Sequence, residues 1–187
     1  MAEWRLFIAV ELPEAARQVL AAVQRELAES RADVKWSRPE AMHLTLKFLG
    51  DTPEGVVPNL SAALDEAAGA SRACVARLGQ VGAFPDVRRP RVVWVGLDEP
   101  TGELVALQKR VEQATAHLAD PDRRGWTAHL TLGRTRSGRH VQRLADLLQG
   151  YCLDSSVAVP VREIVLSRSV LSREGPTYTP LHRAAIG

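Results

Sequence analysis

The tetrapeptide His43-Leu44-Thr45-Leu46 occurs twice in this chain, the second time as His129-Leu130-Thr131-Leu132. The alternation of polar and apolar residues in each copy is typical of a β-strand. Because successive side chains of a strand point to opposite faces, the histidine and threonine share one face and the two leucines share the other. Each copy is therefore predicted to bury its leucines and to present an imidazole and a hydroxyl on the opposite face.

The spacing of the two copies recurs at a second landmark. The histidines are 86 residues apart, and so are Arg5 and Arg91, each of which opens a short apolar run. Hydrophobic periodicity and turn residues divide both halves of the chain in the same order. We predict strands at residues 5–10, 43–49, 73–81, 91–97, 126–132, 163–170 and 178–184, and helices at residues 13–27, 56–68, 101–118 and 141–148. Two landmarks that share one offset indicate an internal duplication.

The duplication predicts one domain, residues 1–187, with two similar lobes. The lobes are roughly residues 1–85 and 86–187, and the chain termini are free to cross between them. The expected fold class is α+β, with two mainly antiparallel sheets that face a central cleft and helices packed outside. A pseudo-two-fold axis between the lobes brings the polar faces of both tetrapeptides to that cleft.

The composition is that of an ordinary soluble globular chain, with 45% apolar and 25% charged residues among 187. The net charge of +2 is too small to indicate nucleic-acid binding by itself, so the positions of the basic residues matter more than their sum. Two arginine clusters are present, one before the strand at 91–97 and one around the second tetrapeptide. They comprise Arg88, Arg89 and Arg91, and Arg123, Arg124, Arg134, Arg136 and Arg139.

The remaining features bear on the cellular context. Cys74 and Cys152 are too few for a disulfide framework and lack the paired spacing of a zinc site, so we expect free thiols. The apolar run at residues 6–10 ends at Glu11 and Pro13, which is too short for a signal peptide or a membrane-spanning helix. We therefore expect a cytoplasmic protein without a membrane partner.

Two imidazoles and two hydroxyls in one cleft are suited to acid–base chemistry. With an ordinary pKa of ~6.5, one imidazole can be protonated while another is neutral near pH 7. Opening a cyclic phosphate needs a base to take a proton from water and an acid to protonate the leaving oxygen. Thr45 and Thr131 can donate hydrogen bonds to the non-bridging phosphate oxygens, where negative charge builds up.

Metal binding is the rival use of paired histidines. Each tetrapeptide supplies one histidine, and no nearby Asp, Glu or Cys has the spacing that completes a zinc site, so we predict no metal and no other cofactor. The other three histidines, His117, His140 and His182, have no partner motif and are expected to be surface or edge residues.

At these residues the chain resembles the two-histidine (2H) phosphoesterases, and among them the LigT-like RNA 2′,3′-cyclic phosphodiesterases once named 2′-5′ RNA ligases. The likeness covers nearly the whole chain. Besides the two tetrapeptides, it includes residues 5–13, 36–40, 82–85, 90–94 and 169–178.

The resemblance implies a bilobal fold and metal-free conversion of an RNA 2′,3′-cyclic phosphate to a 2′-phosphomonoester. It implies His43 as proton donor and His129 as proton acceptor. Arg134, five residues after His129, matches an arginine that the family often has near the phosphate or base, and Phe84 could stack on a base. The expected partner is an RNA with a 2′,3′-cyclic phosphate end, with tRNA fragments and small cyclic nucleotides as candidates, and we expect a monomer.

Two alternatives stay open at this point. The same cleft could act on another phosphodiester, such as ADP-ribose 1″,2″-cyclic phosphate or a 2′-5′ linkage, or join RNA ends reversibly. A binding protein of the same fold could hold RNA ends or nucleotides without turning them over. The presence of both histidines counts against the second alternative.

Overall fold

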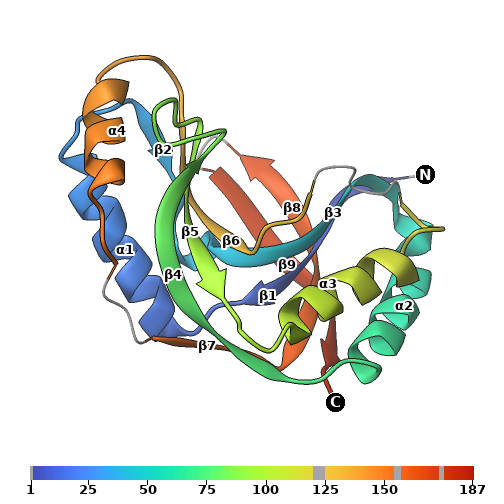
Figure 1. The fold of residues 1–187 in the computed structure, drawn as a ribbon. Coiled ribbons are helices and arrows are strands. Elements are labelled where there is room, and N and C mark those ends of the chain that lie inside the picture. Colours follow the sequence, from blue (N-terminus) through green and yellow to red (C-terminus); the bar gives the residue numbers. More distant parts are fainter. Residues whose placement is uncertain (1, 120–124, 154–156, 173–174) are drawn as a thin grey trace.

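A computed structural model describes residues 2–119, 125–153, 157–172 and 175–187. The repeated order of elements is visible along the chain (Figure 1). The first half contains β1 (Glu3–Glu11), α1 (Glu14–Ala28), β3 (His43–Pro53), α2 (Val57–Gly69) and β4 (Cys74–Phe84). The second half contains β5 (Val92–Asp98), α3 (Glu103–Ala114), β6 (His129–Thr135), α4 (Val141–Gln149) and β8 (Glu163–Ser172). Strands β2 (Val34–Trp36), β7 (Ala158–Val161) and β9 (Gly175–Ala185) and the 3₁₀ turns Pro39–Ala41 and Glu54–Val56 complete the set.

The described strands form one strongly curled sheet, in the order β7-β4-β5-β6-β3-β1-β8-β9, with β2 added beside β6. Helices α1 and α4 lie together outside one half of this sheet, and α2 and α3 lie together outside the other (Figure 1). The α+β class and the outer helices are confirmed. The two sheets expected from the sequence are continuous with each other, because β3 and β6 pair at Leu44 and Leu130.

Each half of the sheet draws strands from both halves of the sequence. Strand β4 pairs with β5 and β7, whereas β8 pairs with β1 and β9. Strand β4, which ends the first repeated unit, therefore lies among strands of the second unit. Strand β8, which ends the second unit, pairs with β1 of the first. A division of the chain at residue 85 does not divide the sheet, since β4 belongs with strands that follow that point.

Hydrophobic periodicity accounts for the helices. In α1 the residues Ala16, Leu20, Val23 and Leu27 are buried, as their spacing predicts. Helix α3 ends at Ala114 and not at residue 118, because the backbone there passes into three-residue turns, in which the amide of Ala116 donates to Gln113 O.

Several strand expectations need correction. Strand β3 continues to Pro53 and not only to residue 49, and β4 continues to Phe84 and not only to residue 81, because pairing with β1 and with β5 extends that far. Strand β6 begins at His129 and not at 126; Trp126 lies before the strand, and its indole donates from Nε1 to Thr45 O at 3.0 Å. Strands β2 and β7 were not predicted, because three or four residues are too few to show alternation. Strand β7 also contains Pro160, which an edge strand tolerates.

Two expectations, on membrane-spanning helices and on the cysteines, can be compared with the structure. Within the described residues, no helix has both the length and the apolar character needed to cross a membrane. Cys74 and Cys152 are free thiols, as expected.

Candidate active site

The pairing of β3 with β6 places the two tetrapeptides side by side. Leu44 and Leu130 are register partners in an antiparallel pair, and both are fully buried. An antiparallel pair centred on these leucines sets His43 beside Thr131 and Thr45 beside His129 on the opposite face. The predicted alternation of faces is confirmed, and the tetrapeptides form one continuous polar surface.

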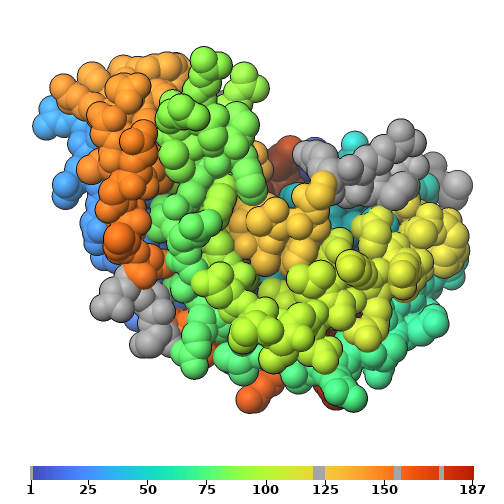
Figure 2. All heavy atoms as spheres, in the orientation of Figure 1, coloured from blue at the N-terminus to red at the C-terminus, as the bar shows by residue number. Residues whose placement is uncertain are grey.

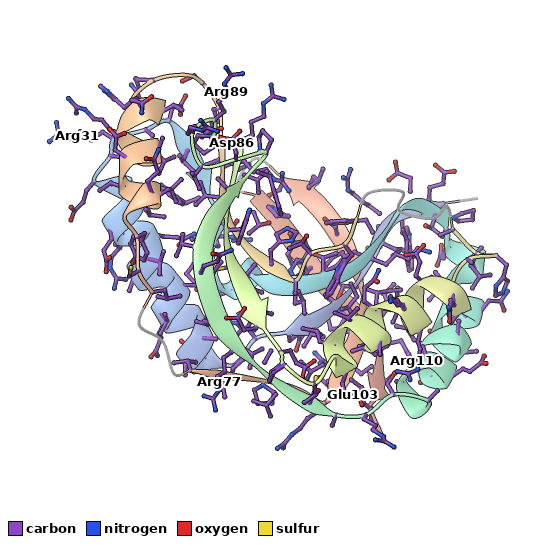
Figure 3. All side chains as sticks on the ribbon, viewed as in Figure 1. Arg31, Arg77, Asp86, Arg89, Glu103 and Arg110 are labelled. Carbon is purple, nitrogen blue, oxygen red and sulfur yellow. The ribbon has the colours of Figure 1, made fainter. Side chains whose placement is uncertain are left out.

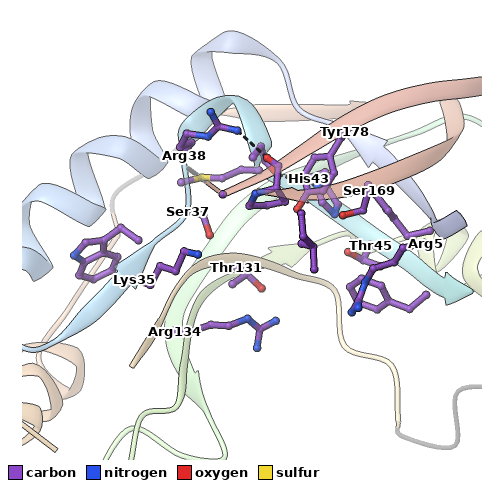
Figure 4. A pocket seen from close by; sticks show the side chains of 18 of the residues that line it. Arg5, Lys35, Ser37, Arg38, His43, Thr45, Thr131, Arg134, Ser169 and Tyr178 are labelled. Carbon is purple, nitrogen blue, oxygen red and sulfur yellow. Dashed lines mark hydrogen bonds between the residues drawn. The ribbon is translucent and has the colours of Figure 1, made fainter. Parts of the chain in front are cut away.

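A cavity of about 540 Å³ covers this polar surface. His43, Thr45, His129 and Thr131 all line it, so the structure brings together the four residues expected from the tetrapeptides. Figure 4 shows His43, Thr45 and Thr131 around the same space. In Figure 2 the molecular surface is hollowed between the half that carries α4 and the half that carries α3.

Both histidines are held by the same kind of hydrogen bond. Nδ1 of His43 lies 2.9 Å from Ala41 O, and Nδ1 of His129 lies 2.8 Å from Thr127 O. A carbonyl oxygen only accepts, so each Nδ1 carries the proton and each neutral ring has its lone pair on Nε2. Nε2 of neither ring has a hydrogen-bond partner within the described parts of the chain, which leaves both free for a substrate.

Aromatic rings fix the plane of each imidazole. His43 stacks on Phe7 with ring centroids 4.6 Å apart and meets Tyr178 edge-on at 5.1 Å. His129 meets Phe84 edge-on at 5.0 Å. Each imidazole is thus oriented by aromatic contacts as well as by its backbone carbonyl.

Phe84 packs against Trp94 and His129 and is not among the described residues that line the cavity. Its base-stacking role stays a prediction. The aromatic side chain that lines the cavity with half of its surface exposed is Phe48, 51% exposed. Strict alternation from His43 predicts Lys47 on this face; instead Lys47 is buried.

Register shifts in the β1–β3 pair explain why Phe48, and not Lys47, faces the cavity. Ile8 pairs with Lys47, but the next residue of β1, Ala9, pairs with Thr45, so β3 has one extra residue at this point. Such a bulge reverses the faces of the residues that follow it. No signal in the sequence marks the bulge, which is why Phe48 was not singled out.

Four cations also line the cavity, namely Arg5, Lys35, Arg38 and Arg134, and no Asp or Glu is among the described lining residues. Arg134 was predicted here, but the other three come from strands and turns distant in sequence. Figure 4 shows Lys35 and Arg134 on one side of Thr131 and Arg5 near Thr45 on the other. Arg38 donates from Nη2 to Pro176 O at 2.7 Å.

The two arginine clusters seen in the sequence lie in different parts of the structure. Arg88 and Arg89 lie at the β4–β5 turn, where their backbone amides donate to Asp86 Oδ1; the labels of Arg89 and Asp86 in Figure 3 mark this turn. In the second cluster Arg134 lines the cavity, Arg136 and Arg139 do not, and Arg123 and Arg124 lie outside the described residues.

The surroundings of the two histidines shift their pKa values. Burial lowers the pKa of His43 below its ordinary value, against the Ala41 carbonyl and Glu11, which raise it. Burial also lowers the pKa of His129, against the Thr127 carbonyl, and Arg134 lowers it further. A carboxylate thus favours the protonated form of His43, whereas a cation favours the neutral form of His129.

Tyr178 is a site residue that the sequence interpretation did not name. Burial raises the pKa of its hydroxyl, against the effect of Arg134, Arg38 and Arg5, which lower it. The phenol is therefore neutral near pH 7 and available as a hydrogen-bond donor within the cavity.

The three remaining histidines lie away from the cavity lining. His182 Nε2 contacts Asp65 Oδ1 at 2.7 Å, outside the cleft, and neither His117 nor His140 is a lining residue. Nowhere in the described ranges do three His, Cys, Asp or Glu side chains gather as a metal site would require.

The arrangement defines a cationic cleft with paired histidines in an α+β fold, and comparison with known proteins gives its family. A family model described as LigT like Phosphoesterase matches residues 10–94. The chain is 33% identical to an RNA 2′,3′-cyclic phosphodiesterase of Archaeoglobus fulgidus, covering 95% of this chain and 97% of the relative. It is 31% identical to the protein of that name from Methanothermobacter thermautotrophicus, covering 95% and 96%.

A solved structure agrees with this. The protein TT0787 of Thermus thermophilus superposes with a TM-score of 0.80 at 27% identity, covering 97% of each chain. The chain therefore belongs to the LigT-like phosphoesterase family.

Proposed function

We propose that this protein hydrolyses RNA 2′,3′-cyclic phosphate ends to 2′-phosphomonoesters, by histidine acid–base catalysis and without a metal ion. The observation that carries the proposal is that His43 and His129, from two identical tetrapeptides, line one cationic cavity. The relatives named RNA 2′,3′-cyclic phosphodiesterases, which match nearly the whole chain, support this class of reaction.

His129 is suited to be the base. Its Nδ1 proton is held by Thr127 O, so the lone pair on Nε2 faces the substrate. Burial and Arg134 favour the neutral ring. Nε2 takes a proton from the water that attacks phosphorus.

His43 is suited to be the acid. Burial lowers the pKa of its ring, the Ala41 carbonyl and Glu11 oppose that effect, and an anionic phosphate bound in the cavity would favour the protonated form further. As the new P–O bond to water forms and the bond from phosphorus to O3′ breaks, Nε2–H protonates O3′. The phosphate then remains on O2′, the orientation that the family resemblance implies.

The hydroxyls and Arg134 complete the proposed site. Thr45 on β3 and Thr131 on β6 lie on the same face of the strand pair and can donate to different non-bridging oxygens. The planar guanidinium of Arg134 offers two parallel donors to the same phosphate. These groups stabilise the charge that builds up in the transition state.

The test is product analysis on a defined substrate. An oligoribonucleotide with a 2′,3′-cyclic phosphate end is incubated with the protein after dialysis against EDTA, beside His129→Ala as the control. We expect a product one water heavier that a phosphatase specific for 3′-phosphates leaves unchanged. Tight binding without turnover would indicate a binding protein, and chelator inactivation reversed by one metal would contradict the metal-free mechanism.

The same test also shows how the ribose is oriented in the cavity. A 3′-phosphate product would keep the histidine pair but reverse the placement of the ribose, with O2′ leaving beside His43. The same reaction run with ADP-ribose 1″,2″-cyclic phosphate, and with two RNA ends together, measures the other activities open to this cleft.

A further inference from the structure

The cavity carries more positive charge than the reacting group needs. A cyclic phosphodiester has one negative charge, whereas four cations and no described carboxylate line the cavity. The reacting phosphate already has two threonine hydroxyls, Arg134 and a protonated imidazole as partners in the proposed mechanism. Some of the remaining cations are therefore available for another anion.

Lys35 and Arg134 form an unusual pair within this group. They are register partners on the adjacent antiparallel strands β2 and β6. Like charges directly opposite each other on neighbouring strands destabilise the pairing. Neither side chain has an ion-pair partner within the described residues, so the structure leaves this repulsion uncompensated. Phosphates bound to the two side chains would relieve it.

Lys35 also differs from the other three lining cations in its relation to the reaction centre. Arg134 affects the pKa of His129, and Arg5, Arg38 and Arg134 all affect that of Tyr178. Lys35 is not among the groups that shift Tyr178 or either histidine. In Figure 4 its amino group points into the cavity beside the hydroxyl of Ser37, on the β2 side.

We propose that Lys35, with the hydroxyl of Ser37 beside it, binds a second phosphate of the substrate, the one that joins the terminal nucleotide to the nucleotide before it, while Arg134 contacts the reacting phosphate. This inference rests on the proposed function. It adds to that function a site for the adjacent phosphate, so that the preferred substrate has at least two nucleotides. A single-stranded RNA backbone on a cationic groove is a common mode of recognition.

The experiment compares a cyclic mononucleotide with a dinucleotide that ends in a 2′,3′-cyclic phosphate. We expect the unaltered protein to prefer the dinucleotide in kcat/KM. Lys35→Ala should lower the ratio of the two kcat/KM values about tenfold, the effect of losing one charge-assisted hydrogen bond. Lys35→Arg should retain the preference.

Salt dependence gives a second readout. For the dinucleotide, the slope of log kcat/KM against log salt concentration should be less steep by about 0.7 in Lys35→Ala, as expected for one lost phosphate contact on a single strand. The matched control is Lys109→Ala, which removes an exposed lysine of α3 that does not line the cavity. It should change neither the ratio nor the slope, and circular dichroism checks the fold of each variant.

Three results would overturn the inference. Equal loss on both substrates in Lys35→Ala would place Lys35 on the reacting phosphate. Unchanged kcat/KM for both substrates in Lys35→Ala would remove Lys35 from substrate binding. A ratio that falls in Arg5→Gln but not in Lys35→Ala would place the second phosphate beside Arg5 of β1. Hydrolysis of neither substrate by the unaltered protein would contradict the proposed function instead; equal affinity for the two compounds would then contradict the subsite.

Discussion

At the scale of single residues, His43 and His129 share a hydrogen-bond arrangement and differ in their charged neighbours. Each donates from Nδ1 to the carbonyl two residues before it, which gives both rings the same tautomer. Glu11 acts on one ring and Arg134 on the other. Identical tetrapeptides are thereby suited to opposite halves of a proton transfer.

The histidine roles predict large and non-additive losses. His43→Ala and His129→Ala should each lower kcat by about 10²–10⁴-fold, the usual contribution of a positioned acid or base. The double variant should be hardly worse than the worse single variant, because the two groups act as a unit. Steady-state kinetics measures the loss, and circular dichroism should show an unchanged fold. Turnover like that of the unaltered protein would remove the substituted residue from the mechanism.

The charge on Arg134 predicts a shift in pH dependence. The profile of kcat/KM should be bell-shaped, with the acidic limb set by protonation of the base. Arg134 lowers the pKa of His129, so Arg134→Gln should raise that pKa and move the acidic limb to higher pH. Arg88→Gln, at the exposed β4–β5 turn, is the matched control. An acidic limb that stays in place in Arg134→Gln would contradict the assignment of His129 as base.

At the scale of elements, helices hold the two tetrapeptide strands from behind. Gln24 of α1 donates from Nε2 to Leu132 O at 2.7 Å, and Gln108 of α3 donates to Leu46 O at 3.4 Å. Leu46 and Leu132 are the last residues of the two tetrapeptides. The helix of each repeated unit thus supports the tetrapeptide strand of the other unit.

A buried ion pair also joins α3 to β3, and it results from the bulge in β3. Lys47 is turned into the protein, where its Nζ lies 2.9 Å from Glu112 Oε1 on α3. The lysine side chain is fully buried, whereas that of Glu112 is 25% exposed. A buried ammonium group needs its counter-charge, so the packing of α3 on β3 depends on this contact.

Removing the counter-charge should destabilise the protein. Glu112→Gln leaves Lys47 buried without its carboxylate and should lower the free energy of unfolding by about 3 kcal/mol. Urea denaturation measures this, with Glu66→Gln on the exposed face of α2 as the control. Replacing both partners, as in Lys47→Met with Glu112→Leu, should restore most of the stability. A midpoint for Glu112→Gln equal to that of the control would show that the pair contributes nothing.

At the scale of the whole molecule, the exchange of β4 and β8 makes the two sides of the sheet interdependent. The cavity lies where β3 meets β6, and each of these strands is flanked by strands from both halves of the sequence. The internal duplication remains a prediction; the repeated order of elements and the equivalent histidine contacts are what it would produce.

This exchange predicts the behaviour of fragments. Residues 1–85 alone would leave β4 without β5 and β7, and β1 without β8. Such a fragment should show no cooperative thermal transition by circular dichroism, because unpaired strands expose backbone groups and apolar faces. The matched fragment, residues 86–187, should behave likewise. Cooperative unfolding of either fragment would mean that a sequence half folds independently.

The sequence by itself determined the local facts about this protein. Alternation in the tetrapeptides fixed which face carries His43 and Thr45, and three-and-four spacing located α1 and most of α3. These features depend on residues a few positions apart, so they can be read from periodicity. The shared offset also gave the repeated order of elements and the meeting of both histidines in one cleft.

Only the tertiary structure decided which strands are neighbours. The direct pairing of Leu44 with Leu130, the exchange of β4 and β8, and the gathering of Arg5, Lys35 and Arg38 all join residues far apart in sequence. The bulge that places Phe48 in the cavity is likewise a property of the β1–β3 pair and not of β3 alone. Strand pairing and register depend on apolar surface buried by the whole chain, a quantity that local periodicity does not contain.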